Sequence, residues 1–183
     1  VVHLGIIYKS LFRQVEARSP WQITFQFGLV PSSNVNNGSR EDTIMIAGLP
    51  FTLSGDAQAL SGLEASVSAS ARYRFRGIGD KPAQFSFGAA VQRVRLSDAA
   101  RDKAPDARNG DYSLDAIELG FGQVLSEQGA DVFWRLDTLL GRNWYGGEPL
   151  STYARAGIVR QWRVGESSVM SATASVERQN RND

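Results

Sequence analysis

Residues 62–76 read Gly-Leu-Glu-Ala-Ser-Val-Ser-Ala-Ser-Ala-Arg-Tyr-Arg-Phe-Arg, with apolar and polar side chains alternating along almost the whole stretch. Because successive side chains of a strand point to opposite faces, this pattern predicts a β-strand with one apolar and one polar face. Ordinary strands run about 5–6 residues, whereas crossing a bilayer at a tilt takes roughly 9–11. The length of this segment therefore favours an apolar face that meets lipid.

The same period of two recurs along most of the chain. Residues 1–18 instead carry one helical apolar stripe, which Pro20 ends, and the short apolar pieces 44–46 and 49–53 predict a small hairpin. We therefore predict one short helix followed by about seven antiparallel strands. The strands other than 62–76 are predicted at 21–30, 83–96, 111–125, 131–142, 151–164 and 167–179.

The predicted connections alternate in length: 31–60, 77–82, 97–110, 126–130, 143–150 and 165–166. Outer-membrane barrels have short periplasmic turns and longer extracellular loops, which places residues 1–20 in the periplasm. We thus predict an all-β, up-and-down transmembrane β-barrel. Aromatic residues are expected to form two girdles. The inner one contains Trp21, Tyr73, Phe75, Phe85, Phe87 and Trp162, and the outer one Tyr112, Trp144, Tyr145 and Tyr153.

Two details qualify this pattern. Arg93 and Arg95 fall on the face of Phe85, and Asp115 falls on the face of Ile117. Either strand ends that project beyond the bilayer or a β-bulge explains these breaks. Since bacterial single-chain barrels have even numbers of strands, an odd count predicts that the chain is part of a larger barrel.

The composition excludes several functional classes. Hydrophobic residues make up 42% of 183 residues, no apolar run approaches the roughly 18–20 residues of a spanning helix, and cysteine is absent. A net charge of +1 gives no case for nucleic-acid binding. His3 is the only histidine, and the sequence offers no other residues that would form a catalytic or metal site with it, so we expect no enzyme, cofactor or metal site.

The alternation of apolar and polar residues does not say which face of the sheet contacts water. A soluble β-protein with a binding cavity therefore stays an alternative.

Charged residues recur on the polar faces of the predicted strands, and arginine outnumbers lysine 17 to 3. In a barrel they would line the lumen, either as a paired structural network or as a selectivity patch for anions or an acidic polypeptide. Arg93 and Arg95 would instead meet lipid phosphates at the outer rim. The lumen candidates are Glu64, Arg72, Arg74, Arg76, Glu118, Arg135, Asp137, Arg155 and Arg163.

Three segments resemble one known family. Arg18-Ser-Pro-Trp21, Phe25-Gln-Phe-Gly-Leu-Val-Pro-Ser-Ser-Asn-Val-Asn-Asn-Gly-Ser39 and Leu53-Ser-Gly-Asp-Ala57 are similar to the junction region of surface lipoprotein assembly modifiers (Slam). The motif residues are Trp21, Gly28, Pro31, Asn34 and Asn36. In that family a periplasmic repeat domain precedes a fourteen-stranded barrel. The resemblance implies that residues 1–20 end a helical repeat domain and that 21–183 form the first part of the barrel.

The resemblance also implies a function. We expect an outer-membrane component of a protein translocon that exports or displays lipoproteins or small secreted proteins. Its expected partners are the lipid bilayer, such a cargo and the barrel assembly machinery, without nucleic acid. The alternative is a porin-like channel for small, preferentially anionic solutes.

Overall fold

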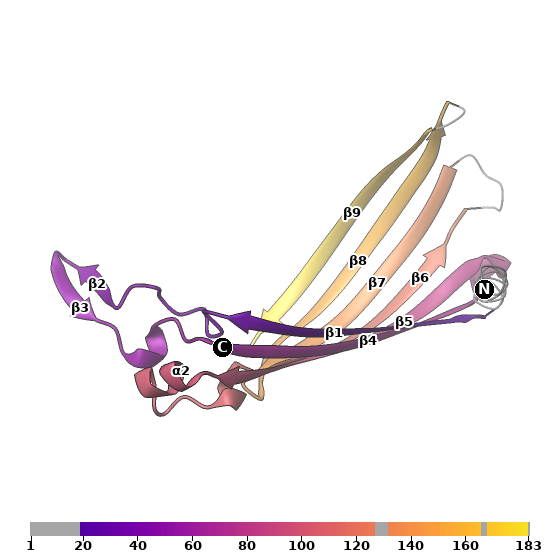
Figure 1. Ribbon diagram of the computed structural model, residues 1–183. Coiled ribbons are helices and arrows are strands. Elements are labelled where there is room, and N and C mark those ends of the chain that lie inside the picture. The colour runs from indigo at the N-terminus through magenta and orange to yellow at the C-terminus, as the bar shows by residue number, and fades with distance from the viewer. Residues whose placement is uncertain (1–18, 127–131, 166–167, 183) are drawn as a thin grey trace, which may run out of the picture.

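The computed structural model describes residues 19–126, 132–165 and 168–182, and the helix predicted at 1–18 lies outside them. The described residues form a seven-stranded antiparallel sheet in chain order, which confirms the all-β, antiparallel part of the prediction (Figure 1). Its strands are β1 (Trp21–Ser32), β4 (Gly62–Arg76), β5 (Pro82–Leu96), β6 (Leu114–Val124), β7 (Val132–Tyr145), β8 (Glu148–Val164) and β9 (Ser168–Arg181).

A separate hairpin interrupts the connection between β1 and β4. Its strands β2 (Thr43–Ile46) and β3 (Leu49–Thr52) are joined by Ala47 and Gly48, whose φ angles are 50° and 83°. Two central residues with positive φ form the tight turn that suits the twist of a hairpin. The hairpin predicted within loop 31–60 is therefore confirmed. It projects well beyond the strand ends of the large sheet (Figure 1).

The connection between β7 and β8 is shorter than predicted. Only Gly146 and Gly147, with φ angles of 60° and 88°, separate the two strands. Because glycine adopts positive φ without a Cβ clash, this pair closes a tight turn, and both strands continue through the supposed loop. The long loop predicted at 143–150 is therefore wrong, and so is the strict alternation of long and short connections.

The strand register resolves the two breaks in the alternation. β5 pairs without a shift with β4 and with β6, whereas an irregularity occurs between β7 and β8, at Asn143/Trp144. Arg93, Arg95 and Asp115 therefore share the face of Phe85 and Ile117 without any bulge on β5 or β6. The bulge interpretation is wrong, and projection of the strand ends beyond a bilayer stays a prediction.

The two edges of the sheet have a defined relation. β1 forms one edge and β9 the other, and each of the six steps between them reverses strand direction. The edge strands consequently run in the same direction. The strands fan out because the sheet twists strongly, so that β9 is steeply inclined to β1 (Figure 1). Over the described residues the sheet is open rather than a closed barrel.

The long connections around the start of β4 and the end of β5 fold together at one end of the sheet, called the loop end here; the opposite end is called the turn end. The segment predicted as a plain loop at 97–110 contains α2 (Asp98–Lys103), whose amide at Ala100 donates to the Ser97 hydroxyl as an N-cap. The 3₁₀ turns Gly55–Ala57 and Asn109–Tyr112 complete these connections, and a further one, Ile78–Asp80, lies in the turn between β4 and β5 at the turn end.

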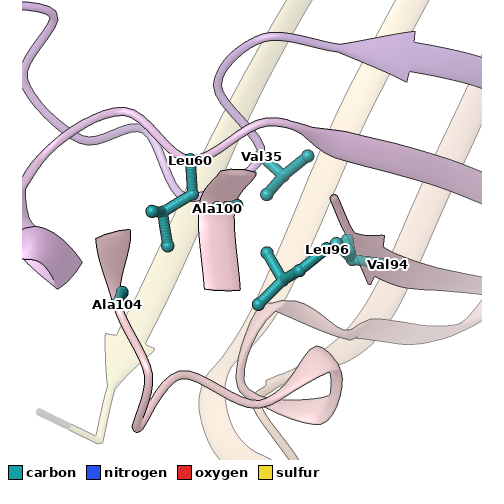
Figure 2. Packing of buried hydrophobic residues seen from close by; sticks show 6 residues of the cluster. All are labelled: Val35, Leu60, Val94, Leu96, Ala100 and Ala104. Carbon is teal, nitrogen blue, oxygen red and sulfur yellow. The ribbon is translucent and has the colours of Figure 1, made fainter. Parts of the chain in front are cut away.

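A small apolar core holds the loop end together (Figure 2). This loop cluster consists of Val35, Leu60, Val94, Leu96, Ala100 and Ala104. Val94 and Leu96 belong to β5 and lie on the face of Glu64, with which Val94 pairs. The connections therefore pack against the same face of the sheet that carries the charged residues. Burial raises the pKa of Tyr112, which packs against the cluster, and the Asp111 carboxylate adds to this shift.

Candidate functional site: the two faces of the sheet

All nine lumen candidates lie on one face of the sheet. The strand register shows that Glu64, Arg72 and Arg155 lie on the same side of the sheet, together with every second residue from them along each strand and their partners on the neighbouring strands. We call this side the polar face. The opposite side, which carries Phe25, Ala69 and Phe87, is called the apolar face. The polar face thus brings together Glu64, Arg72, Arg74, Arg76, Glu118, Arg135, Asp137, Arg155 and Arg163.

Several of these charges pair with one another or with their neighbours. The Arg135 guanidinium donates to Asp137 at 2.8 Å, and Arg155 Nε donates to Glu177 Oε2 at 2.7 Å. The side chains are partly exposed, so such pairs fix orientation more than they stabilise the fold. The other contacts are with neutral groups or nearby loops. Gln92 donates to Glu64, Arg72 to Gln22, Arg74 to the Ser19 carbonyl, and Arg76 to the Asp80 carbonyl.

One interaction on this face spans three strands. Tyr153 on β8 donates its hydroxyl hydrogen to Glu118 on β6, and Gly141 of β7 lies between them in the same row. A Cβ added to Gly141 would lie 2.2 Å from the ring carbon Cζ of Tyr153. The tyrosine therefore crosses the intervening strand only because that position is glycine. The sequence predicts Tyr153 in the outer girdle. Its contact with Glu118 depends on Gly141 of the neighbouring strand, which the pattern of a single strand does not contain.

Gly141→Ala is expected to destabilise the sheet by about 1–3 kcal/mol, because the methyl group displaces the Tyr153 ring and breaks its bond to Glu118. Urea unfolding of the full-length protein in detergent micelles measures this change. The matched control is the same substitution in a Tyr153→Ala background, where the ring is gone and the added loss should be small. Equal losses in both backgrounds would contradict the crossing arrangement.

The centre of the polar face carries small side chains. Shallow hollows of about 320 and 300 Å³ lie on it, the second lined in part by Ser68, Ser70, Gly88 and Glu118. Small residues in the middle of a strand leave space above the sheet that larger residues would fill. The described part of this face is therefore polar and open at its centre.

The apolar face is uncovered over the described residues. Phe25, Phe27 and Val176 are 63%, 78% and 70% exposed, although in a soluble β-protein residues with this alternation would be buried. At the turn end an aromatic cluster joins Trp21, Tyr73, Phe75, Phe85 and Phe121, with ring centroids 4.7–6.5 Å apart. The outer girdle does not form as predicted, since Tyr145 and Tyr153 lie on the polar face and Tyr112 packs in the loop cluster. Trp144 alone of that set lies on the apolar face.

The charged boundary of the apolar face is staggered. Its first charged residue toward the loop end is Arg93 on β5, Asp115 on β6, Arg142 on β7 and Arg178 on β9. In the pairing register each of these residues lies two residues closer to the turn end than the one before. From β5 to β9 the total displacement is six residues across four strand spacings. At roughly 3.3 Å per residue and about 4.8 Å between strands, a plane through these residues crosses the strands at a tilt of about 45°.

The family-like motif residues hold the start of the sheet and the first loop. The Trp21 ring contacts Tyr73, Gly28 leaves space for the Ser66 hydroxyl, and Pro31 pairs with Leu63. Asn34 exchanges hydrogen bonds with the backbone of Gly38. Asn36 donates to the carbonyls of Asp56 and Gln58 at 2.9 and 2.8 Å and accepts from the Leu60 amide at 2.9 Å. These asparagines thus tie residues 34–38 to the segment before β4.

Asn36→Ala is expected to loosen this loop by about 1–3 kcal/mol, since the partly buried Leu60 amide loses its acceptor. Hydrogen exchange at the Leu60 and Val35 amides measures the change, and both should exchange at least tenfold faster. Asn37→Gly is the control, because Asn37 has a φ of 53° that glycine adopts readily. Unchanged protection in Asn36→Ala would mean that the loop does not depend on this side chain.

Among the described residues, no helix is long and apolar enough to span a membrane, and no group of metal-binding side chains is found. No family model, no curated protein and no solved structure matches the chain. The two faces of the sheet are therefore the features of the molecule that indicate a function.

Proposed function

We propose that the seven-stranded sheet is part of an outer-membrane β-barrel that serves a protein translocon, exporting or displaying lipoproteins or small secreted proteins. The observation that carries the membrane assignment is the staggered charged boundary beside an exposed apolar face. Barrel strands tilt by roughly 35–45° in the membrane, and the tilt of about 45° derived from Arg93, Asp115, Arg142 and Arg178 agrees with this range.

The polar face supports a path for a polypeptide. Its centre is lined by small side chains, and the Arg135–Asp137 and Arg155–Glu177 pairs neutralise part of its charge. A polar surface with an open centre suits an extended chain, whose backbone groups need polar surroundings. The resemblance of the Trp21–Asn36 region to Slam proteins supports lipoproteins or small secreted proteins as the cargo. The loop cluster would then lie near the exit, because it packs at the loop end of the polar face.

A porin-like channel is the alternative, and one observation favours it. Arg72, Arg74 and Arg76 follow one another on the polar face toward the turn end of β4. A row of cations in a pore raises the local concentration of anions and sets anion preference.

Planar bilayers and a deletion strain separate the two functions, with the full-length protein used for both. A translocon predicts low, unsteady conductance, and deletion of its gene should remove a lipoprotein from the cell surface, as measured by antibody labelling of intact cells. Steady, large, anion-selective conductance with unchanged surface display would favour the channel. A protein that stays monomeric in buffer without detergent would refute both.

A further inference from the structure

The loop end of the apolar face combines cations with an adjoining hydrophobic surface. On the apolar face of β5, Val91 is followed by Arg93 and then by Arg95. On the same face of β7, Leu140 is followed by Arg142. Arg178 follows Val176 on β9. Arg93, Arg142 and Arg178 are thus each the next residue on their face after an apolar residue, about 6–7 Å along the strand, and Arg95 follows Arg93.

Two of these arginines are held in place by neighbours. Arg93 contacts Asp115 through two parallel bonds of 2.7 and 3.2 Å, so its charge is locally neutralised. The Arg142 guanidinium lies 5.2 Å from the centre of the Trp144 ring. Stacking on a ring uses the flat side of a guanidinium and leaves its N–H edge available to an anion. Since Asp115 offsets Arg93, the boundary keeps three positive charges, from Arg95, Arg142 and Arg178.

We propose that this boundary binds the phosphate groups of multiply phosphorylated, multiply acylated lipids of the outer leaflet, with the chemistry of lipid A, side by side along the sheet. Their acyl chains would lie along Val91, Leu140 and Val176, and their phosphates beside Arg95, Arg142 and Arg178. The inference deepens the proposed function and rests on its membrane assignment. Two features select these lipids: a boundary of cations beside apolar surface, and its extent over several strands, which a single small phosphate does not span.

The test titrates lipid A into the full-length protein in neutral detergent micelles and follows tryptophan fluorescence, to which Trp144 beside Arg142 contributes. In the triple variant Arg95→Gln/Arg142→Gln/Arg178→Gln the apparent Kd should rise roughly 100-fold, since each arginine near a lipid surface contributes about a factor of five. The double variant Arg95→Gln/Arg178→Gln leaves the Arg142–Trp144 contact and should lose roughly 30-fold. The control is Arg40→Gln/Arg101→Gln, which removes two exposed loop charges away from the boundary and should keep the wild-type Kd.

Several results would overturn the inference. Wild-type affinity in the double variant, or an equal loss in the control, means that the boundary arginines are not the site. Equal affinity for phosphatidylglycerol refutes the multiply phosphorylated lipid, and displacement by millimolar inorganic phosphate refutes a lipid ligand. A protein that requires detergent and displays its cargo, yet shows no response to lipid A, refutes the lipid site alone. A protein that needs no detergent refutes the lipid site together with the proposed function.

Discussion

Ala69→Arg is expected to destabilise the protein in lipid vesicles by about 2–4 kcal/mol, the range measured for arginine at the middle of the lipid-facing side of a barrel. Ala69 lies on the apolar face between Phe25 and Ala89, four residues from Tyr73 of the aromatic cluster and four from Ala65, which pairs with Arg93. It is therefore central in the apolar band. Guanidinium denaturation of the full-length protein in phosphatidylcholine vesicles measures the loss.

Ser70→Arg is the matched control, because it adds the same side chain to a small residue one position along the same strand. Ser70 lies on the polar face next to Gly88, and Glu118 lies beside that glycine. In water and near a carboxylate the new arginine should change stability by less than about 1 kcal/mol. If Ser70→Arg were the more damaging of the two, the apolar face would be the wet side and the membrane assignment would fail.

Leu60→Ala is expected to unfold the loop end locally, with a loss of about 2–5 kcal/mol in the stability of the loop cluster. Leu60 is fully buried, and the methyl groups removed leave a cavity between Val35, Leu96 and Ala100. Its carbonyl also accepts from the Val35 amide at 2.8 Å, so its displacement disturbs both connections. Hydrogen exchange at Val35 and Ala100 should become faster, while exchange in the strands stays unchanged.

Leu49→Ala provides the comparison for Leu60. Leu49 lies at the tip of the β2–β3 hairpin and is 62% exposed, so its truncation should change stability by less than about 0.5 kcal/mol. Similar losses for the two leucines would mean that the loop cluster is not a packed core.

The alternation at 62–76 was sufficient to predict β4 and its two faces, because a period of two is a local property of one strand. The same reasoning placed the nine charged candidates on one face. It failed where pairing decides the outcome. Gly146-Gly147 closes a turn between strands that extend further than their patterns show, and Tyr153 reaches Glu118 across Gly141 on another strand.

The loop cluster was also beyond sequence reasoning. Val94 and Leu96 interrupt the polar face of β5, and the opposite residues Arg93 and Arg95 interrupt its apolar face, so the two faces exchange character at the same place. In the sequence, only Arg93 and Arg95 on the apolar face stand out as an anomaly. The burial of Val94 and Leu96 depends on contacts with Val35, Leu60 and α2. These partners belong to connections that the sequence predicts only as polar loops rich in turn formers.

The shared direction of β1 and β9 restricts what can complete the sheet. A second copy joined by a two-fold axis, β1 against β1, would be inverted and would carry its loop cluster on the other side of the bilayer. Closure with antiparallel pairing alone instead needs an odd number of added strands, beginning and ending opposite in direction to these edges. In the proposed membrane setting, where the loop end and the turn end face different compartments, self-assembly of identical sheets through β1 is thereby disfavoured.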